Sequence, residues 1–346
     1  MVLDRREGEA LIEVNDLKTY FFLDEGTVRA IDGVTFDIRR GQTLGVVGES
    51  GCGKSVTAQS ILRIVPHPGR IVGGSILLHR YSGSGGNSQV ESVVDLTSLN
   101  PRGDQIRAIR GAEIALIFQE PMTSFSPVHT IGNQIMEAIL LHRRVSKSEA
   151  RGIATDMLRR CGLPRAEDVI NRYPWELSGG MRQRSMIAMA LSCQPSLLIA
   201  DEPTTALDVT TQAQVLNLMR DLQEEMGMAI MYITHNLGVI AEVAEEVIVM
   251  YLGKVVERTD VNSLFNDPRH PYTQALLRSI PKLGRRSRTR LDTIKGMVPD
   301  PYNIPRGCPF HPRCPQARDG LCNVQEPQVV DVGGGHLVSC LLIKGQ

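Results

Sequence analysis

The chain has 346 residues, of which 42% are hydrophobic and 22% charged, and its formal net charge at pH 7 is +0. This length fits one large domain with an appendage, or two domains, in an ordinary globular protein. The lack of a basic excess argues against a protein that works mainly on nucleic acid. No apolar run reaches the ~18–20 residues that span a bilayer, and the first residues lack the apolar core of a secretory signal. We therefore expect a cytosolic protein, or one docked on a membrane from the cytosolic side.

The first part of the chain alternates short apolar runs with segments of helical character. Leu11–Val14 and Val34–Ile38 are expected to be strands, and Thr43–Val47 is expected to be a strand that ends in a Gly-rich turn. Helical character follows over Lys54–Val65. The polar, low-complexity stretch Tyr81–Ser88 predicts an exposed hairpin tip or loop.

A phosphate-binding loop is predicted between the third strand and the first helix. Gly48 to Ser55 read GESGCGKS, which matches G-x-x-x-x-G-K-[ST] in the strand–turn–helix context that the motif requires. Glycines let backbone N–H groups turn towards phosphate oxygens, and the helix N-terminus favours an anion. Lys54 can reach the β- and γ-phosphates and Ser55 can ligate Mg²⁺, so we favour a nucleotide site over a chance Gly-rich turn. The predicted site comprises Gly48, Glu49, Ser50, Gly51, Cys52, Gly53, Lys54, Ser55 and Val56.

The second half of the chain continues the alternation. Ile114–Phe118 is expected to be a buried strand, and residues 131–161 are expected to be helical with charged faces. Ser178 is a natural N-cap for a helix over Gly179–Ser192. Further strands of a mostly parallel sheet, buried on both faces, are expected at Leu197–Ala200, Ala229–Thr234 and Val247–Met250.

An acidic pair, Asp201 and Glu202, follows one of these strands. Open α/β sheets bind ligands at the carboxyl ends of their strands. Asp201 is expected to serve the Mg²⁺ ion, and Glu202 to lie beside the γ-phosphate and polarise the attacking water as a general base. Acidic residues often end strands at a solvated edge, but the phosphate-binding loop elsewhere in the chain favours the catalytic interpretation.

The segment 177–184 reads LSGGMRQR and resembles the LSGGQ signature of the ABC ATPases. A Ser cap and two Gly at a helix start present backbone N–H groups to an anion. In this family the anion is the γ-phosphate held by the opposite subunit, so the resemblance implies that Ser178, Gly179 and Gly180 contact a nucleotide across a head-to-tail dimer. Met181 stands where Gln is commonest, past the Ser-Gly-Gly contact.

The resemblance extends to other positions in sequence order. Gln119 matches the Q-loop glutamine, which implies a ligand of Mg²⁺ and water that is coupled to a helical subdomain. Asp208 ends the segment 206–208, which matches the D-loop. His235 matches the switch histidine, implied to contact the γ-phosphate and to hold the attacking water. The aromatic residue that stacks on adenine is expected to be Phe21, with Tyr20 as the other candidate.

Four longer segments narrow the resemblance to importers of dipeptides or oligopeptides: 117–127, 181–191, 201–216 and 269–281. Within that group, PTTALD and MTS look like the D-type ATPase subunit, whereas Phe125-Ser126-Pro127 departs from the commoner Leu-Asn-Pro. The resemblance implies a heterodimer with an F-type ATPase subunit on two membrane permeases, peripheral to the cytoplasmic side of the inner membrane. An extracytoplasmic peptide-binding protein would supply the cargo, and no nucleic acid would take part.

Other functions remain open on the sequence. Nickel and glutathione importers share these motifs, so the motifs do not fix the cargo. A soluble ABC ATPase that remodels DNA or ribosomes is the alternative class, and an ABC protein that only regulates or scaffolds is another. The single cassette, the lack of heptad arms and the intact Glu202 and His235 favour the importer.

The resemblance covers nearly the whole chain and implies an α/β fold. We expect a P-loop NTPase (RecA-like) ABC nucleotide-binding domain over residues 1–264, with a helical subdomain at about 120–180. The composition shifts towards Pro and Arg after Asp267, and residues 284–290 look like a basic linker. We therefore expect a small Cys-rich C-terminal extension over residues 265–346.

Four cysteines crowd into this extension: Cys308, Cys314, Cys322 and Cys340. Their spacing is not that of a standard ferredoxin or zinc finger. A Pro-rich lobe with little apolar mass favours a metal that acts as its core over four ordinary buried thiols. Zinc, with His311 as a further ligand, and iron–sulfur fit the spacing about equally. D-type peptide importer subunits carry a similar Cys set that binds a [4Fe-4S] cluster, so the resemblance favours that cluster with a structural or regulatory role.

Overall fold

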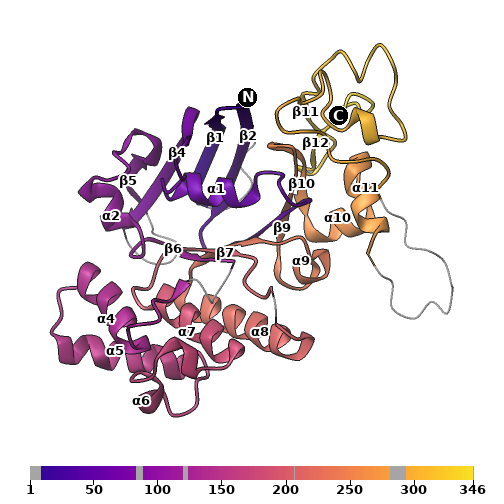
Figure 1. The fold of residues 1–346 in the computed structure, drawn as a ribbon. Coiled ribbons are helices and arrows are strands. Elements are labelled where there is room, and N and C mark those ends of the chain that lie inside the picture. The colour runs from indigo at the N-terminus through magenta and orange to yellow at the C-terminus, as the bar shows by residue number, and fades with distance from the viewer. Residues whose placement is uncertain (1–8, 83–88, 120–123, 206, 281–293, 346) are drawn as a thin grey trace, which may run out of the picture. The chain divides into compact units, whose positions relative to one another are not determined.

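The structure, a computed structural model, describes residues 9–82, 89–119, 124–205, 207–280 and 294–345. The chain divides into two compact units. The first unit comprises residues 1–37, 43–97 and 234–346, and the second comprises residues 38–42 and 98–233 (Figure 1).

In one sheet of the first unit, β1 pairs antiparallel with β4, and β4 pairs antiparallel with β5. Its strand order is β2-β1-β4-β5, formed by β1 (Ala10–Leu23), β2 (Gly26–Arg39), β4 (Gly69–Ser82) and β5 (Gln89–Asp95). Buried apolar residues alternate along β2 at Val34, Phe36 and Ile38. Alternation with period two buries one face of a sheet and exposes the other.

The first unit also holds strands in the order β11-β12-β10-β9-β3 (Figure 1). Their bounds are β3 (Thr43–Val47), β9 (Glu246–Tyr251), β10 (Lys254–Asp260), β11 (Val329–Asp331) and β12 (Leu337–Ser339). β3 pairs parallel with β9, and every residue of both strands is buried, as expected for a strand covered on both faces. β12 pairs antiparallel with β10, so the C-terminal residues extend this sheet.

The helices of the first unit are short. They are α1 (Lys54–Ile61), α9 (Leu237–Val243), α10 (Val261–Asn266) and α11 (Pro271–Arg278), with 3₁₀ turns at Leu96–Ser98 and His311–Arg313. α11 begins with proline, whose missing N–H costs nothing at that position, and the His270 side chain caps it by accepting from the Tyr272 amide at 3.0 Å.

The second unit combines parallel strands with a group of helices (Figure 1). Its strands lie in the order β8-β7-β6: β6 (Ile114–Ile117), β7 (Leu197–Asp201) and β8 (Ala229–Ile233). Its helices are α2 (Asp104–Ile109), α4 (Ile131–His142), α5 (Lys147–Arg160), α6 (Ala166–Val169), α7 (Gly179–Leu191) and α8 (Val209–Met226), with a 3₁₀ turn at Pro174–Glu176. α4, α5 and α7 pack against one another.

The expected elements are largely confirmed. Thr43–Val47 coincides with β3, whereas Leu11–Val14 and Val34–Ile38 lie inside longer strands. The first helix ends earlier than expected because Arg63 adopts a left-handed φ of 56°, which a helix does not accommodate. Tyr81 belongs to β4, while residues 83–88 and the linker-like stretch 284–290 lie outside the described residues. Within the described part of the chain, none of the helices is long and apolar enough to cross a membrane.

Candidate nucleotide-binding and catalytic site

The loop Gly48–Gly53 connects β3 to α1 in the first unit. Gly48 and Gly53 adopt φ values of 154° and 104°. A Cβ atom on Gly48 would lie 2.3 Å from the Met250 carbonyl oxygen, and one on Gly53 would lie 2.4 Å from the Ala30 carbonyl oxygen. Both positions therefore require glycine, for backbone angle and for space, as the phosphate-binding motif predicts.

Lys54 begins α1 and folds back across this loop. Its ammonium donates to the carbonyl oxygens of Gly48 at 2.8 Å and Glu49 at 3.1 Å, and the residue is 6% exposed. Burial raises the pKa of the neighbouring Cys52 thiol, which therefore stays neutral at physiological pH. The cationic side chain of the loop thus lies over the backbone that the motif assigns to phosphate binding. Ser55 and Val56 follow on the first turn of α1.

The two candidates for the adenine-stacking residue are neighbours on β1. Consecutive strand residues point to opposite faces of a sheet, so only one of them can face the nucleotide. The Tyr20 hydroxyl donates to Asp32 Oδ1 at 2.6 Å, and burial together with this bond raises its pKa to about 12. The Phe21 ring has no hydroxyl to make such a hydrogen bond, and Phe21 pairs with Gly69 on β4. The assignment to Phe21 remains a prediction.

The acidic pair lies at the end of β7 in the second unit. Asp201 is the last strand residue, and the Glu202 amide donates to the Ile233 carbonyl at 2.8 Å. The Glu202 carboxylate accepts from Gln119 Nε2 at 3.2 Å and from Thr205 Oγ1 at 2.9 Å. The structure therefore brings together two residues predicted to be catalytic, Gln119 and Glu202. Thr205, which the sequence motifs did not single out, is a third member of this group.

Glu202 also has an unusual backbone. Its φ of 48° lies in the left-handed region, which non-glycine residues rarely adopt. Such conformations cost on the order of 1–3 kcal/mol and occur preferentially at functional sites. The bent backbone and the two donors hold the carboxylate in one orientation at the strand end, which is what a general base requires.

The signature segment forms the N-terminus of α7, as expected. The Ser178 hydroxyl accepts from the Met181 amide at 3.3 Å, which confirms the predicted cap. Ser178 and Gly179 are exposed, and a Cβ on Gly179 would meet nothing within 4 Å. The start of this 13-residue helix therefore presents backbone N–H groups on the surface of the second unit. At Gly180, by contrast, an added Cβ atom would lie 3.2 Å from the Thr211 side chain.

Asp208 and His235 also lie at helix starts. Asp208 caps α8 by accepting from the Thr210 and Thr211 amides at 3.0 Å and from the Thr211 hydroxyl at 2.6 Å. These hydrogen bonds, that of the Thr211 side chain first, lower the pKa of Asp208. His235 is exposed in the turn between β8 and α9, one residue before the Asn236 cap. The nucleotide contacts assigned to Asp208 and His235 remain predictions, and Ala206 lies outside the described residues.

Comparison with known proteins decides the family. Residues 31–205 match the family model described as ABC transporter. The chain belongs to the ABC transporter family. Residues 256–322 match a second family model, described as the C-terminal region of oligopeptide/dipeptide transporters. The family assignment and the ATPase class made from the sequence are confirmed.

Relatives of this ABC protein match it over almost its whole length. It is 50% identical over 335 residues to the oligopeptide transport ATP-binding protein AppD of Bacillus subtilis, covering 96% of this chain and 97% of that protein. It is 43% identical over 331 residues to the dipeptide transport ATP-binding protein DppD of Escherichia coli, with 96% of each chain covered.

A solved structure confirms the cassette fold. It is the dimeric, post-hydrolysis state of the ATP-binding cassette MJ0796 bound to ADP and Pi, which is 25% identical to this chain with a TM-score of 0.61. The match covers 72% of this chain and 98% of that one. The predicted α/β cassette fold is therefore confirmed.

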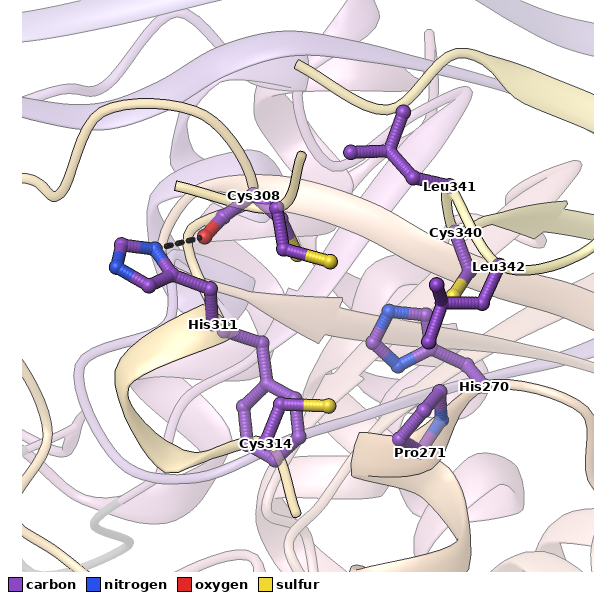
Figure 2. A pocket seen from close by; sticks show the side chains of 10 residues that line it. His270, Pro271, Cys308, His311, Cys314, Cys340, Leu341 and Leu342 are labelled. Atoms are coloured by element: carbon purple, nitrogen blue, oxygen red, sulfur yellow. Dashed lines mark hydrogen bonds between the residues drawn. The ribbon is translucent and has the colours of Figure 1, made fainter. Parts of the chain in front are cut away.

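The C-terminal cysteines of the ABC protein do not form the predicted metal site. All four line one small cavity of about 10 Å³, together with His270, Phe310 and His311 (Figure 2). Among the described residues, no group of three or more His, Cys, Asp or Glu side chains is arranged to hold a metal ion. The predictions of a [4Fe-4S] cluster and of its zinc alternative are therefore wrong.

Buried and half-buried thiols, and two histidines with backbone partners, line the cavity. Burial raises the pKa of Cys308 to about 11 and also raises the pKa values of Cys314 and Cys340, because a buried thiolate loses its hydration. His270 accepts from the Tyr272 amide, and His311 Nδ1 lies 2.9 Å from the Cys308 carbonyl oxygen (Figure 2).

The apolar core of this region is larger than its sequence indicates. Phe310 is 1% exposed and packs against Tyr251 and Tyr272, with ring centroids 5.2 and 5.3 Å apart. The C-terminal residues thus share an aromatic core with β9 and α11. A metal is not needed as a substitute for such a core.

Proposed function

We propose that this protein hydrolyses ATP to power the import of dipeptides or oligopeptides across the bacterial inner membrane. The observation that carries the proposal is the match of residues 256–322 to the C-terminal region of oligopeptide/dipeptide transporters, in the same chain as an ABC cassette. Relatives named for oligopeptide and dipeptide transport support the same cargo. Nickel and glutathione are the alternative cargoes, and no matched family description favours them.

In the proposed site the first unit holds the triphosphate. Backbone N–H groups of Gly48–Val56 bind phosphate oxygens, Lys54 neutralises the β- and γ-phosphates, and Phe21 stacks on adenine. Ser55, Gln119 and Asp201 offer the hard oxygen ligands that Mg²⁺ prefers. Bound Mg²⁺ would neutralise charge on the phosphate oxygens.

The proposed chemistry is attack of water on the γ-phosphorus. The oxygen of the water bonds to the γ-phosphorus while Glu202 accepts a proton from that water. In the same step the bond between the γ-phosphorus and the ADP oxygen breaks. The hydrogen bonds of Glu202 with Gln119 and Thr205 orient the carboxylate for this transfer. His235 is assigned to hold the water and the γ-phosphate.

A second ATPase subunit completes the proposed site. Ser178, Gly179 and Gly180 of one subunit would contact the γ-phosphate bound to the other, with Asp208 beside them. The exposed helix N-terminus at Ser178 supports this assignment, since N–H groups there favour an anion. The proposed partner is an F-type ATPase subunit, and the pair would dock on two permeases at the cytoplasmic side, supplied by an extracytoplasmic peptide-binding protein.

The test is transport by the reconstituted complex. The chain is co-expressed with candidate permeases, the second ATPase and the binding protein, placed in liposomes, and supplied with ATP and labelled cargo. Uptake of di- or oligopeptides is expected, with none for nickel or glutathione. Uptake of nickel or glutathione alone would reassign the cargo, and ATPase activity without permease association would support the soluble class.

A further inference from the structure

An ion pair links the predicted phosphate-binding loop to the C-terminal lobe, residues 294–345. Arg313 binds the Glu49 carboxylate in bidentate fashion, with Nη1–Oε2 at 2.6 Å and Nη2–Oε1 at 3.0 Å. The Arg313 side chain is 4% exposed and that of Glu49 is 26% exposed. A bidentate guanidinium–carboxylate pair fixes orientation as well as charge, and its shielded position reduces screening by salt.

The backbone of the same residue has its own anchor. The Glu49 amide donates to the Tyr272 hydroxyl at 2.9 Å, and Tyr272 is fully buried. Arg313 Nη1 also lies 3.4 Å from the Tyr251 hydroxyl oxygen. Residues outside the GESGCGKS motif thus hold Glu49 through both its side chain and its main chain.

This anchoring acts on the part of the loop that positions Lys54. The carbonyls that accept from the Lys54 ammonium belong to Gly48 and Glu49. Gly48, Gly51 and Gly53 lack the steric restriction that keeps other residues in one conformation. A loop of this kind needs outside contacts to keep its shape, and Arg313 and Tyr272 supply them.

Neutralisation of charge is a second effect of the Arg313–Glu49 pair on the loop. A carboxylate next to a site for a triphosphate repels that ligand, because like charges at a few ångströms interact strongly where water is partly excluded. Arg313 neutralises Glu49 at this position. Without Arg313 the loop would be less well held and would carry an uncompensated negative charge.

We propose that Arg313 is a positioning residue for ATP: through Glu49, and together with Tyr272, it shapes and neutralises the phosphate-binding loop, so the C-terminal lobe sets the ATP affinity of the cassette. This inference rests on the proposed function, in that it takes Gly48–Ser55 as the ATP site. The alternative is a purely structural tie that holds the lobe in place without affecting ATP.

The test measures MgATP affinity on the full-length chain, and steady-state ATPase kinetics on the same chain assembled with its second ATPase subunit. Arg313→Gln is expected to raise KM and Kd for MgATP by about tenfold, the scale of one charge-assisted contact, with kcat little changed. Arg313→Lys, which keeps the charge but loses the bidentate geometry, should give an intermediate increase. The double variant Glu49→Gln/Arg313→Gln should recover part of the affinity, because the repelling carboxylate is gone while the bidentate anchor is still missing.

A matched control lies in the same lobe. Arg306 is exposed, so Arg306→Gln should leave KM, Kd and kcat at wild-type values. A structural tie predicts lower thermal stability in Arg313→Gln but unchanged affinity of the folded fraction, and that result would overturn the proposal. If Arg313→Gln does not fold, Arg313→Lys decides: a KM raised about threefold or more supports the proposal, and a wild-type KM rejects it.

A further variant separates this inference from the proposed function. Lys54→Ala should abolish MgATP binding if Gly48–Ser55 is the ATP site. Binding that survives Lys54→Ala would refute the site itself. Loss of binding in Lys54→Ala together with normal binding in Arg313→Gln would refute only the role of Arg313.

Discussion

At the scale of single residues, Glu202 shows how backbone and side chain combine at a position predicted to be catalytic. Its left-handed φ turns the chain at the end of β7, and Gln119 and Thr205 hold its carboxylate. Strain at such a residue persists only when surrounding contacts hold it. The arrangement suits a base that must accept a proton from a positioned water.

Glu202→Gln is expected to bind MgATP normally and to lose ATPase activity by about 100-fold or more, the usual contribution of a general base. The amide has nearly the same shape but accepts no proton at neutral pH. Single-turnover hydrolysis and nucleotide binding should be measured in parallel, with gel filtration in ATP to detect a trapped dimer. The control Thr205→Val removes one donor and should reduce turnover much less. Wild-type turnover in Glu202→Gln would remove Glu202 from the role of base.

The adenine contact gives a second prediction at this scale. Phe21→Ala should weaken MgATP binding by about tenfold, since stacking of a base on an aromatic side chain is worth ~1–3 kcal/mol. Tyr20→Leu should leave ATP affinity unchanged but lower the stability by about 1 kcal/mol, because the bond to Asp32 is lost. Fluorescent nucleotide titration and urea unfolding measure the two effects. The reverse pattern would make Tyr20 the stacking residue.

The predictability of a residue from sequence depended on how local its contacts are. The Gly48–Ser55 loop and the Ser178 cap each depend on residues that are close together in the sequence, and the structure has both in the expected place. The partners of Glu49 lie more than 200 residues away at Tyr272 and Arg313, and no spacing rule connects them. The metal predicted at the four C-terminal cysteines was wrong for a related reason, since the contacts of that lobe are also distant in sequence. The lobe was expected to lack an apolar core, whereas Phe310 packs against Tyr251 and Tyr272.

At the scale of elements, the junction of β10, α11 and β12 ties the C-terminal strands to the first unit. Glu257 on β10 is 0% exposed and accepts from the Arg269 amide at 2.7 Å and the His270 amide at 3.0 Å. His336, just before β12, lies 2.7 Å from the same carboxylate. Burial opposes ionisation of Glu257, but its hydrogen bonds outweigh burial and hold its pKa below the usual value.

This junction predicts a pH-dependent stability. Burial lowers the pKa of His270 to about 4, although the Glu257 carboxylate acts in the opposite sense. The unfolded chain therefore binds a proton near pH 6.5 that the folded chain binds only near pH 4. The contribution of neutral His270 to the free energy of unfolding is fully present above pH 6.5 and is lost as the pH falls towards 4. The total loss is on the order of 3 kcal/mol.

Urea unfolding followed between pH 7.5 and 4 measures this effect. His270→Asn is the matched control, because an Asn oxygen can accept from the Tyr272 amide as a helix cap without titrating. The variant should lose most of the pH dependence between 6.5 and 4.5. The Glu257 carboxylate adds its own loss only below about pH 4.5, as its lowered pKa requires. A wild-type slope in His270→Asn would assign the effect to another group.

At the scale of the whole molecule, sequence motifs identified the family, while the organisation of the C-terminal part depends on tertiary contacts. The boundary expected near residue 264 remains a prediction. β12 shares a sheet with β10, however, and Phe310 shares a core with Tyr251 and Tyr272. These contacts join residues far apart in sequence. Composition and local periodicity cannot reveal these contacts, because composition only counts residue types and periodicity only relates residues that are near in the sequence.

The last prediction tests whether this aromatic core stabilises the first unit. Phe310→Ala removes a ring that is 1% exposed and leaves a cavity between Tyr251 and Tyr272. Large-to-small changes of this kind cost about 3–5 kcal/mol, so the urea midpoint should fall well below that of the wild type. Phe310→Leu should lose less, because it refills part of the volume. Val324→Ala, at a site 66% exposed in the same lobe, should stay within about 0.5 kcal/mol of the wild type. If Phe310→Ala unfolded at the wild-type midpoint, the C-terminal lobe would have to be stabilised by something other than this aromatic core.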